Sequence, residues 1–227
     1  MSKVSLISYT TANPGSVNLE MMTSQDIITY CARVSNPSNQ SKMDTSEKLL
    51  KYLIDHKHWS PLEMVDVTLE IETTRDIGRQ ILRHRSFSFQ EFSQRYADPT
   101  VSGLGFETRE ARWQDTKNRQ NSIELDDDNP ELQKEWLQHQ QTVIVLAQGV
   151  YEWALDKGIA KEVARAVLPE GLTKTRMYMK GSLRSWVHFY FVRFDPSTQK
   201  ETRIIAEQCW QHLIGVYPFL KSLVTKP

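Results

Sequence analysis

Apolar residues recur at every second position in several segments, and this pattern predicts strands. Between residues 65 and 71 they alternate with acidic and hydroxyl residues, which is typical of a half-buried strand whose polar face meets water or a partner subunit. The same pattern predicts strands at residues 4–9 and 173–179, the second ended by a turn at Lys180-Gly181. Residues 86–93 also alternate, but both faces mix aromatic with polar side chains.

Apolar residues at helical spacing predict helices between these strands. The predicted helices span residues 24–34, 45–57, 75–83, 131–157, 159–168, 182–193 and 196–216, with Ser24 and Asp195 as N-caps. The polar stretch 97–130 is a loop or carries an added short helix. We therefore predict a mixed α/β (α+β) fold, a single domain over residues 1–227 with a central sheet flanked by helices.

The composition is that of an ordinary globular chain, with 39% hydrophobic and 25% charged residues in a length of 227. Lys plus Arg and Asp plus Glu number 28 each, which argues against a general nucleic-acid-binding surface but leaves room for a local anion site. The sequence has no segment long and apolar enough for a signal peptide or a membrane span. We therefore expect a cytoplasmic protein.

The two cysteines predict a structural role. Cys31 and Cys209 stand alone, without a C-x-x-C pair, and each lies among apolar residues at helical spacing. Their spacing fits neither a disulfide framework nor a metal site, and His56 and His58 lack the spacing of a zinc-binding helix. We expect core packing in a reducing compartment, and no metal.

The segment from Arg83 to Arg95 is the first candidate for chemistry. It holds three arginines, a histidine and a carboxylate among alternating aromatic and polar residues. Arginine presents a planar fork to oxyanions, so this segment suits the wall of a site for an anionic ligand. Arg95, with Arg165 further along, is our candidate for binding a phosphate. The alternative is a surface ion pair, which is the common role of a single arginine.

The same segment resembles the signature of the flavin-dependent thymidylate synthases. That pattern is Arg-His-Arg, two residues, Ser, four residues, Ser, one residue, Arg. Every fixed position is filled here, by Arg83, His84, Arg85, Ser88, Ser93 and Arg95. The resemblance extends from the stretch 58–63 through Gln80 and Arg165 to the region 193–201.

The resemblance implies an activity, reductive methylation of 2′-deoxyuridine 5′-monophosphate (dUMP) to thymidylate (dTMP). It implies FAD as cofactor, NADPH as the reductant of FAD, and methylenetetrahydrofolate as the one-carbon donor, with tetrahydrofolate released. It also implies a homotetramer whose active sites lie between chains. Neither a nucleic acid nor a membrane is expected as a partner.

The resemblance also assigns residues. Arg193 takes the catalytic role, because its counterpart favours ionisation of the pyrimidine N3 and so makes C5 nucleophilic without a cysteine thiolate. Substrate-binding positions correspond to Gln80, Ile81, Leu82, Arg83, Glu91, Phe92, Ser93, Gln94, Arg95, Arg165 and Arg193. Cofactor-binding positions correspond to Ser60, Arg83, His84, Arg85, Glu91, Ser182, Leu183, Arg184 and His188.

The chain departs from the family pattern at three places. Gln90 stands where Asn is frequent, Ser197 where His is frequent, and Ser182-Leu183 where Asn-Ala is familiar. Because serine supplies no imidazole, we expect the nicotinamide or folate side of the pocket to differ.

Two other functional classes of protein stay open. A nucleotide- or RNA-binding module could use the same arginines with neighbouring aromatic residues, and a structural oligomer would leave the polar strand unexplained.

Overall fold

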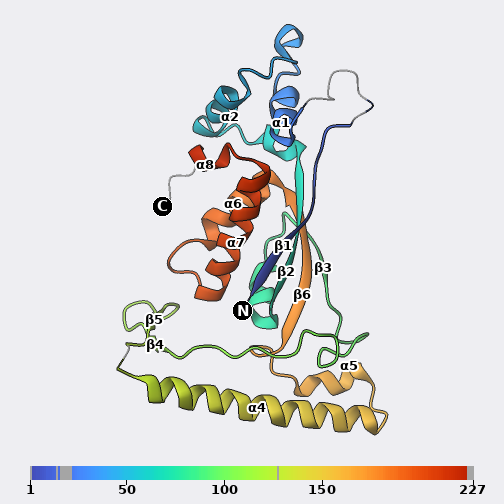
Figure 1. Cartoon of the computed structure of the whole chain (residues 1–227), viewed down its shortest axis with the longest axis vertical. Helices are drawn as coiled ribbons and strands as arrows, with labels where there is room; N and C mark the ends of the chain where they lie inside the picture. Colours follow the sequence, from blue (N-terminus) through green and yellow to red (C-terminus); the bar gives the residue numbers. More distant parts are fainter. Residues whose placement is uncertain (1, 14, 16–21, 127, 224–227) are drawn as a thin grey trace.

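One four-stranded antiparallel sheet runs along the length of the molecule (Figure 1). The computed structural model describes residues 2–13, 15, 22–126 and 128–223. The strand order is β1-β2-β6-β3. The strands are β1 (Lys3–Tyr9), β2 (Asp66–Thr74), β6 (Lys174–Ser182) and β3 (Ser88–Glu91). The strands predicted at 4–9 and 65–71 are thus confirmed.

Strand β6 continues through Lys180-Gly181, where a turn was predicted, so that prediction is wrong. Gly181 pairs with Val67, next to the Asp66–Ser182 pair that ends the β2–β6 ladder. The glycine serves close packing: a Cβ built on Gly181 would lie 2.5 Å from Cδ1 of Phe87. The absent side chain therefore lets an aromatic ring lie directly on the strand.

Strand β3 is shorter than the predicted 86–93 and pairs with β6 alone. Just beyond it, the Phe92 N–H still donates to the Arg176 carbonyl at 2.9 Å. The Ser93 carbonyl then accepts from the N–H groups of Tyr96 and Ala97. A turn at Ser93 therefore takes the chain off the sheet edge earlier than the polarity pattern indicates.

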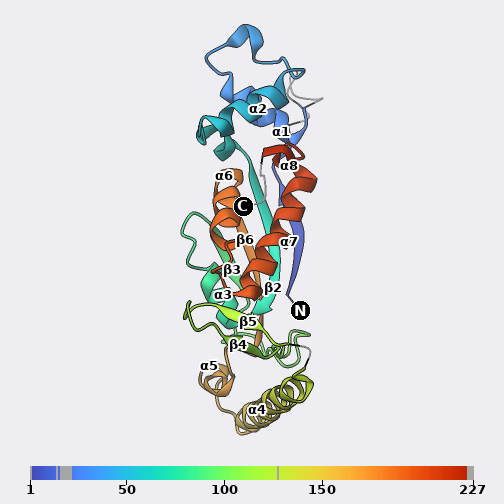
Figure 2. The same cartoon turned by 90° about the vertical axis from the view of Figure 1, so that its left-hand side faces the viewer.

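Helices α6 and α7 cover one face of the sheet, while α1 and α2 lie at one end and α4 and α5 at the other (Figures 1 and 2). The main core lies between this face and α6 and α7, and a second cluster lies between α4 and the segment after it. The prediction of one domain over residues 1–227 stays a prediction. The helices are α1 (Ser24–Ala32), α2 (Ser46–Asp55), α3 (Arg75–Ile81), α4 (Pro130–Asp156), α5 (Lys161–Ala164), α6 (Leu183–Arg193), α7 (Lys200–Val216) and α8 (Leu220–Leu223), with 3₁₀ turns at Pro37–Asn39, Ser60–Met64 and Arg165–Val167.

One predicted helix cap and one predicted helix start are wrong. The cap of α1 is Thr23 and not Ser24, since the Asp26 carboxylate accepts from the backbone N–H of Thr23. Helix α7 begins at Lys200 and not at Pro196. The Asp195 carboxylate, predicted to cap the helix, instead accepts from the backbone N–H and the hydroxyl of Ser197 and so stabilises a turn.

Two further predictions needed refinement. The helix predicted over 159–168 is only α5 followed by the 3₁₀ turn Arg165–Val167. The polar stretch 97–130 carries a β-hairpin and not an added helix, with β4 (Arg112–Gln114) antiparallel to β5 (Ser122–Glu124). In the described residues, no helix is long and apolar enough to cross a membrane.

The polar face of the sheet carries cross-strand ion pairs. Arg176 donates to Glu72 at 2.6 Å, and Lys180 lies 3.5 Å from Asp66. The alternation predicted for residues 65–71 is confirmed, because the odd-numbered side chains of residues 66–72 are buried and the even-numbered ones are half-buried. Long helix α4 leaves large apolar side chains in solvent, among them Leu146, which is 64% exposed, and Trp153, which is 56% exposed.

The contact of Gly181 with Phe87 gives a stability prediction. Gly181→Ala should lower the free energy of unfolding by about 1–3 kcal/mol, because the new methyl group overlaps a ring packed against Trp186. Gly149→Ala in α4 is the control: outside its own helix backbone, an added Cβ would meet no heavy atom within 4 Å, so this variant should be neutral or stabilise by up to about 1 kcal/mol. Urea unfolding of both variants measures the difference. Equal effects would contradict the packing role.

Candidate functional site

The predicted site residues fall into two groups on different elements. The first group lies at the end of α3, in the segment after it, and on α6; it includes Gln80, Arg83, His84 and Arg193. The second group follows β3 and reaches α5; it includes Arg95 and Arg165. Figure 1 shows α5 at the lower end of the molecule, while α6 lies beside the sheet.

Arg193 lies in the last turn of α6 and is held by two acceptors. Its Nε donates to Nε2 of His84 at 2.7 Å, and its Nη2 donates to the backbone carbonyl of Gln80 at 2.8 Å. The His84 ring packs edge-on against Phe189 of α6, with centroids 4.9 Å apart. The residue predicted to be catalytic thus joins α3 to α6.

This contact determines the protonation of His84. Because a guanidinium can only donate, Nε2 must carry the lone pair and Nδ1 the proton. The pKa of His84 is lowered to about 4, chiefly by burial and then by electrostatic interaction with Arg193 and His188. At neutral pH the neutral imidazole is therefore the form that holds Arg193.

The first group carries positive charge without a counter-ion. Among the described residues, no carboxylate forms an ion pair with Arg83, Arg85 or Arg193. Burial and the nearby Arg83 lower the pKa of Arg193, but a guanidinium stays charged at neutral pH. Arg193 is partly buried and Arg83 and Arg85 are exposed, so three cations without a carboxylate partner face a ligand site here. Such a group favours an anionic ligand.

A cavity of about 540 Å³ is lined by residues of α6 and by Ser86, which follows the Arg83-His84-Arg85 segment. It contains two predicted cofactor residues, Arg184 and His188, and Arg184 forms an ion pair with Glu63 across it. Sequence reasoning did not single out the other lining residues, although two belong to the stretch 58–63 that carries the resemblance. The lining residues are Trp59, Glu63, Ser86, Arg184, Ser185, Val187, His188 and Phe191.

An adjoining cavity of about 410 Å³ includes Ser182 and shares Glu63, Ser86 and Ser185 with the first. The hydroxyl of Ser182 caps α6 by accepting from the Ser185 N–H at 3.3 Å. Aromatic walls, hydroxyls and the nearby unpaired cations suit a ligand that is both aromatic and anionic, such as a flavin nucleotide. Ser60, also predicted, lies exposed at the start of the 3₁₀ turn that includes Glu63.

The second group meets at Glu162. Arg95 lies 3.2 Å from the Glu162 carboxylate, and Arg165 donates to the Glu162 backbone carbonyl at 3.4 Å. Glu91 is engaged elsewhere, since its carboxylate accepts from the Thr175 hydroxyl at 2.9 Å and lies 3.4 Å from Arg75. The two phosphate candidates are thus brought together, whereas Glu91 faces β6 and α3.

Several predicted site residues have side chains that point into the protein. Ile81 and Leu183 are fully buried in the core, and Gln94 is 4% exposed. The Leu183 N–H donates to the Val65 carbonyl at 2.9 Å. Leu82 and Phe92 are half-buried, and Ser93 is exposed. In this chain Ile81 and Leu183 can therefore face a ligand only through their backbone.

Neither cysteine is activated. Cys209 lies in the main core and Cys31 is half-buried, and burial raises the pKa of both thiols. A thiolate is the nucleophilic form, so both are poor nucleophiles. In the described part of the chain, His, Cys, Asp and Glu side chains form no group of three or more that could hold a metal ion.

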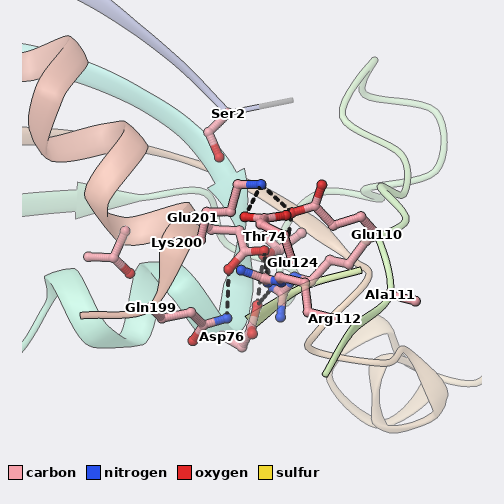
Figure 3. A network of polar contacts seen from close by, with 12 residues as sticks. Ser2, Thr74, Asp76, Glu110, Ala111, Arg112, Glu124, Gln199, Lys200 and Glu201 are labelled. Carbon is pink, nitrogen blue, oxygen red and sulfur yellow. Dashed lines mark hydrogen bonds and ion pairs between the residues drawn. The ribbon is translucent and has the colours of Figure 1, made fainter. Parts of the chain in front are cut away.

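A polar network beside Gln80 was not predicted. The Gln80 side chain contacts Gln199 and Thr202 at the start of α7. Arg112 of the hairpin donates to Glu201, and Lys200 bridges Glu110 and Glu124 (Figure 3). No local pattern indicates this network, because its members come from four distant segments of the chain.

Comparisons with known proteins found matches over most of the chain. Residues 18–219 match the family model described as thymidylate synthase complementing protein. The flavin-dependent thymidylate synthase of Synechocystis sp. is 54% identical over 188 residues, which is 82% of this chain and 83% of the relative. A probable flavin-dependent thymidylate synthase of Paramecium bursaria Chlorella virus 1 is 45% identical over 198 residues, 86% of this chain and 88% of the relative.

A solved structure shows the same fold. The UMP/dUMP methylase PolB from Streptomyces cacaoi, bound with 5-Br dUMP, superimposes with a TM-score of 0.77 over 95% of this chain and 91% of that one, at 24% identity. The mixed α/β prediction is thereby confirmed. With the family match over residues 18–219 and two relatives above 40% identity, the chain belongs to the thymidylate synthase complementing proteins, the flavin-dependent thymidylate synthases.

Proposed function

We propose that this chain methylates dUMP reductively to dTMP as a flavin-dependent thymidylate synthase. The observation that carries the proposal is the Arg193 guanidinium, which is partly buried, fixed by His84 and the Gln80 carbonyl, and unpaired with any carboxylate of the described residues. The relative at 54% identity is a flavin-dependent thymidylate synthase and the one at 45% a probable flavin-dependent thymidylate synthase, which supports the proposal.

Arg193 acts on the base. Its fixed positive charge stabilises a pyrimidine ionised at N3, and the electron density released into the ring makes C5 nucleophilic. A covalent thiolate is then unnecessary, in agreement with the raised thiol pKa of Cys209 and Cys31. Because both acceptors of Arg193 are uncharged, they orient the guanidinium without neutralising it.

The cofactor is assigned to the first group. Bound FAD, reduced by NADPH, supplies the hydride, and methylenetetrahydrofolate supplies the one-carbon unit. Arg83, Arg85 and Arg184 would neutralise the pyrophosphate of FAD. The side chains of Trp59 and Phe191 would pack on the apolar parts of the cofactor. Neutral His84 keeps Arg193 in place at the other end of α6 from Arg184.

The nucleotide phosphate is assigned to Arg95 and Arg165. Both lie against Glu162, one through its carboxylate and the other through its backbone carbonyl. A phosphate offers more acceptor oxygens than the single carboxylate and binds arginine forks through paired hydrogen bonds. It would therefore replace Glu162 as the partner of Arg95.

A complete site needs more than one chain. The residues assigned to the base and those assigned to the phosphate lie on different elements, and helix α4 leaves apolar side chains such as Leu146 and Trp153 in solvent. Both features support a homotetramer in which one chain supplies Arg193 and another supplies Arg165 to the same nucleotide. The composition and the reduced cysteines support a cytoplasmic location.

The function is tested directly on the purified protein. It should show the visible absorption of oxidised flavin, and it should convert dUMP to dTMP when NADPH and methylenetetrahydrofolate are present. NADPH should bleach the flavin band in the absence of oxygen. A colourless protein that gains no visible band after incubation with FAD, and forms no dTMP, would contradict the proposal.

Arg165→Ala should separate phosphate from base recognition. Loss of a charge-assisted contact should weaken dUMP binding by about 1.5–3 kcal/mol, roughly 10- to 150-fold, while binding of deoxyuridine should stay the same. Calorimetric titration of both ligands measures this. Arg119→Ala in the exposed part of the β4–β5 hairpin removes the same charge and serves as control. Equal weakening of both ligands by Arg165→Ala would mean that Arg165 supports the fold instead.

Replacement of Arg193 should act on methyl transfer. Arg193→Lys keeps the charge but cannot reach both acceptors, whereas Arg193→Ala loses the charge and both hydrogen bonds. The rate of dTMP formation should therefore fall from wild type to Lys to Ala, by about 100- to 1000-fold for Ala. Bleaching of the flavin band by NADPH should change much less, since it needs no activated pyrimidine. If Arg193→Ala slows both equally, the assigned role is wrong.

A further inference from the structure

A chain of hydrogen bonds leads from the β4–β5 hairpin to Gln80. Arg112 donates to one carboxylate oxygen of Glu201, and Nε2 of Gln199 donates to the other at 2.9 Å. Oε1 of Gln199 accepts from Nε2 of Gln80 at 2.7 Å, and Oε1 of Gln80 accepts from the Thr202 hydroxyl at 3.0 Å. Figure 3 shows Arg112, Gln199 and Glu201 at the hairpin end of this relay.

The direction of every bond in the relay follows from its charged end. An ionised carboxylate only accepts, so Gln199 must turn its NH₂ group to Glu201 and its oxygen to Gln80. Gln80 must then turn its NH₂ group to Gln199 and its oxygen to Thr202. Two amides that could each take either orientation are thereby fixed in one.

Burial makes this fixation effective. Thr202 is fully buried, the Arg112 side chain is 9% exposed and the Glu201 side chain is 19% exposed. The backbone carbonyl of Gln199 also accepts from the N–H groups of Thr202 and Arg203 at the start of α7, so its side chain starts from a fixed place. A reversed amide would leave donor facing donor where little water can intervene.

We propose that Glu201 is a positioning residue for substrate binding, which acts through Gln199 to fix the direction in which the Gln80 amide meets the nucleotide. This inference rests on the proposed function, in which Gln80 contacts dUMP. After the relay is satisfied, the Gln80 amide keeps one N–H and one oxygen lone pair for a ligand. The Glu201 carboxylate, which reaches Gln80 through Gln199, determines on which side of the amide this N–H and this lone pair lie.

Glu201→Gln should reverse the relay without changing its volume. The new amide must give its oxygen to Arg112, which only donates, and so presents NH₂ to Gln199. Gln199 then rotates its amide, and Gln80 follows with its NH₂ group toward the Thr202 hydroxyl, which can accept. The substrate would meet the Gln80 amide with donor and acceptor exchanged.

The double variant Gln199→Glu with Glu201→Gln should restore the original direction. Its carboxylate at position 199 accepts from Gln80 and from the amide at position 201, which gives its oxygen to Arg112. The net charge equals that of the wild type. A purely structural need for a carboxylate at position 201 would not be met by this exchange.

The experiment compares the affinity for dUMP and the steady-state constants of three variants with the wild type. Glu201→Gln should weaken dUMP binding about fivefold, as for one lost neutral hydrogen bond, and should raise KM more than it lowers kcat. The double variant should bind dUMP like the wild type. Glu207→Gln is the control, since Glu207 accepts from Gln211 on the same helix, outside the relay.

Three results would overturn the inference. Wild-type affinity in Glu201→Gln would show that the relay does not direct the Gln80 amide. Equal weakening in the single and double variants, with thermal unfolding unchanged, would assign the effect to the carboxylate at position 201 itself. A wild-type protein that binds no dUMP would overturn the proposed function, whereas normal wild-type binding confines a failure to the relay.

Discussion

The indole N–H of Trp186 donates to the Val67 carbonyl at 3.1 Å inside the core, and the position of the site depends on this bond. Strand β6 passes into α6 without an intervening loop, and Ser182 is both the last strand residue and the helix cap. One end of α6 is thus fixed by the sheet and its first turn by Trp186. The last turn, with Arg193, has little freedom to move away from α3.

The contacts of Arg193 explain how a guanidinium without a carboxylate partner is tolerated. A partly buried guanidinium with no counter-ion is costly unless its donors are satisfied. Here one donor meets a neutral imidazole and another a backbone carbonyl, so hydrogen bonding is provided while the charge is retained. A carboxylate in place of His84 would satisfy Arg193 equally well, but it would cancel the field that an ionised pyrimidine needs.

Local patterns predicted the parts of this molecule whose cause is local. The alternation in β2 reflects one buried and one polar face, and the Arg83–Arg95 motif could be found from residue types alone. Gly181 was wrongly predicted to form a turn, because the Phe87 ring that requires a glycine at this position lies far away in the sequence. Pro196 and Asp195 have the chemistry of a helix start, but Ser197 competes for the Asp195 carboxylate.

Long-range polar contacts escaped prediction for a related reason. The orientation of the Gln80 amide depends on residues 112, 199 and 201, and no spacing rule connects them. The three-residue strands β4 and β5 are too short to show a period. The two groups of site residues also could not be separated from sequence, since one motif runs from just after α3 to beyond β3.

The neutral state of His84 has a consequence in acid. Its pKa in the folded chain is about 4, below the ordinary value of 6.5, so the fold favours the uncharged ring. The stability contributed by this ring is complete above the ordinary value and is lost as the pH falls toward 4. A proton on Nε2 removes the acceptor of Arg193 and places a second cation against it. The joint between α3 and α6 is therefore sensitive to protons, although neither partner is a carboxylate.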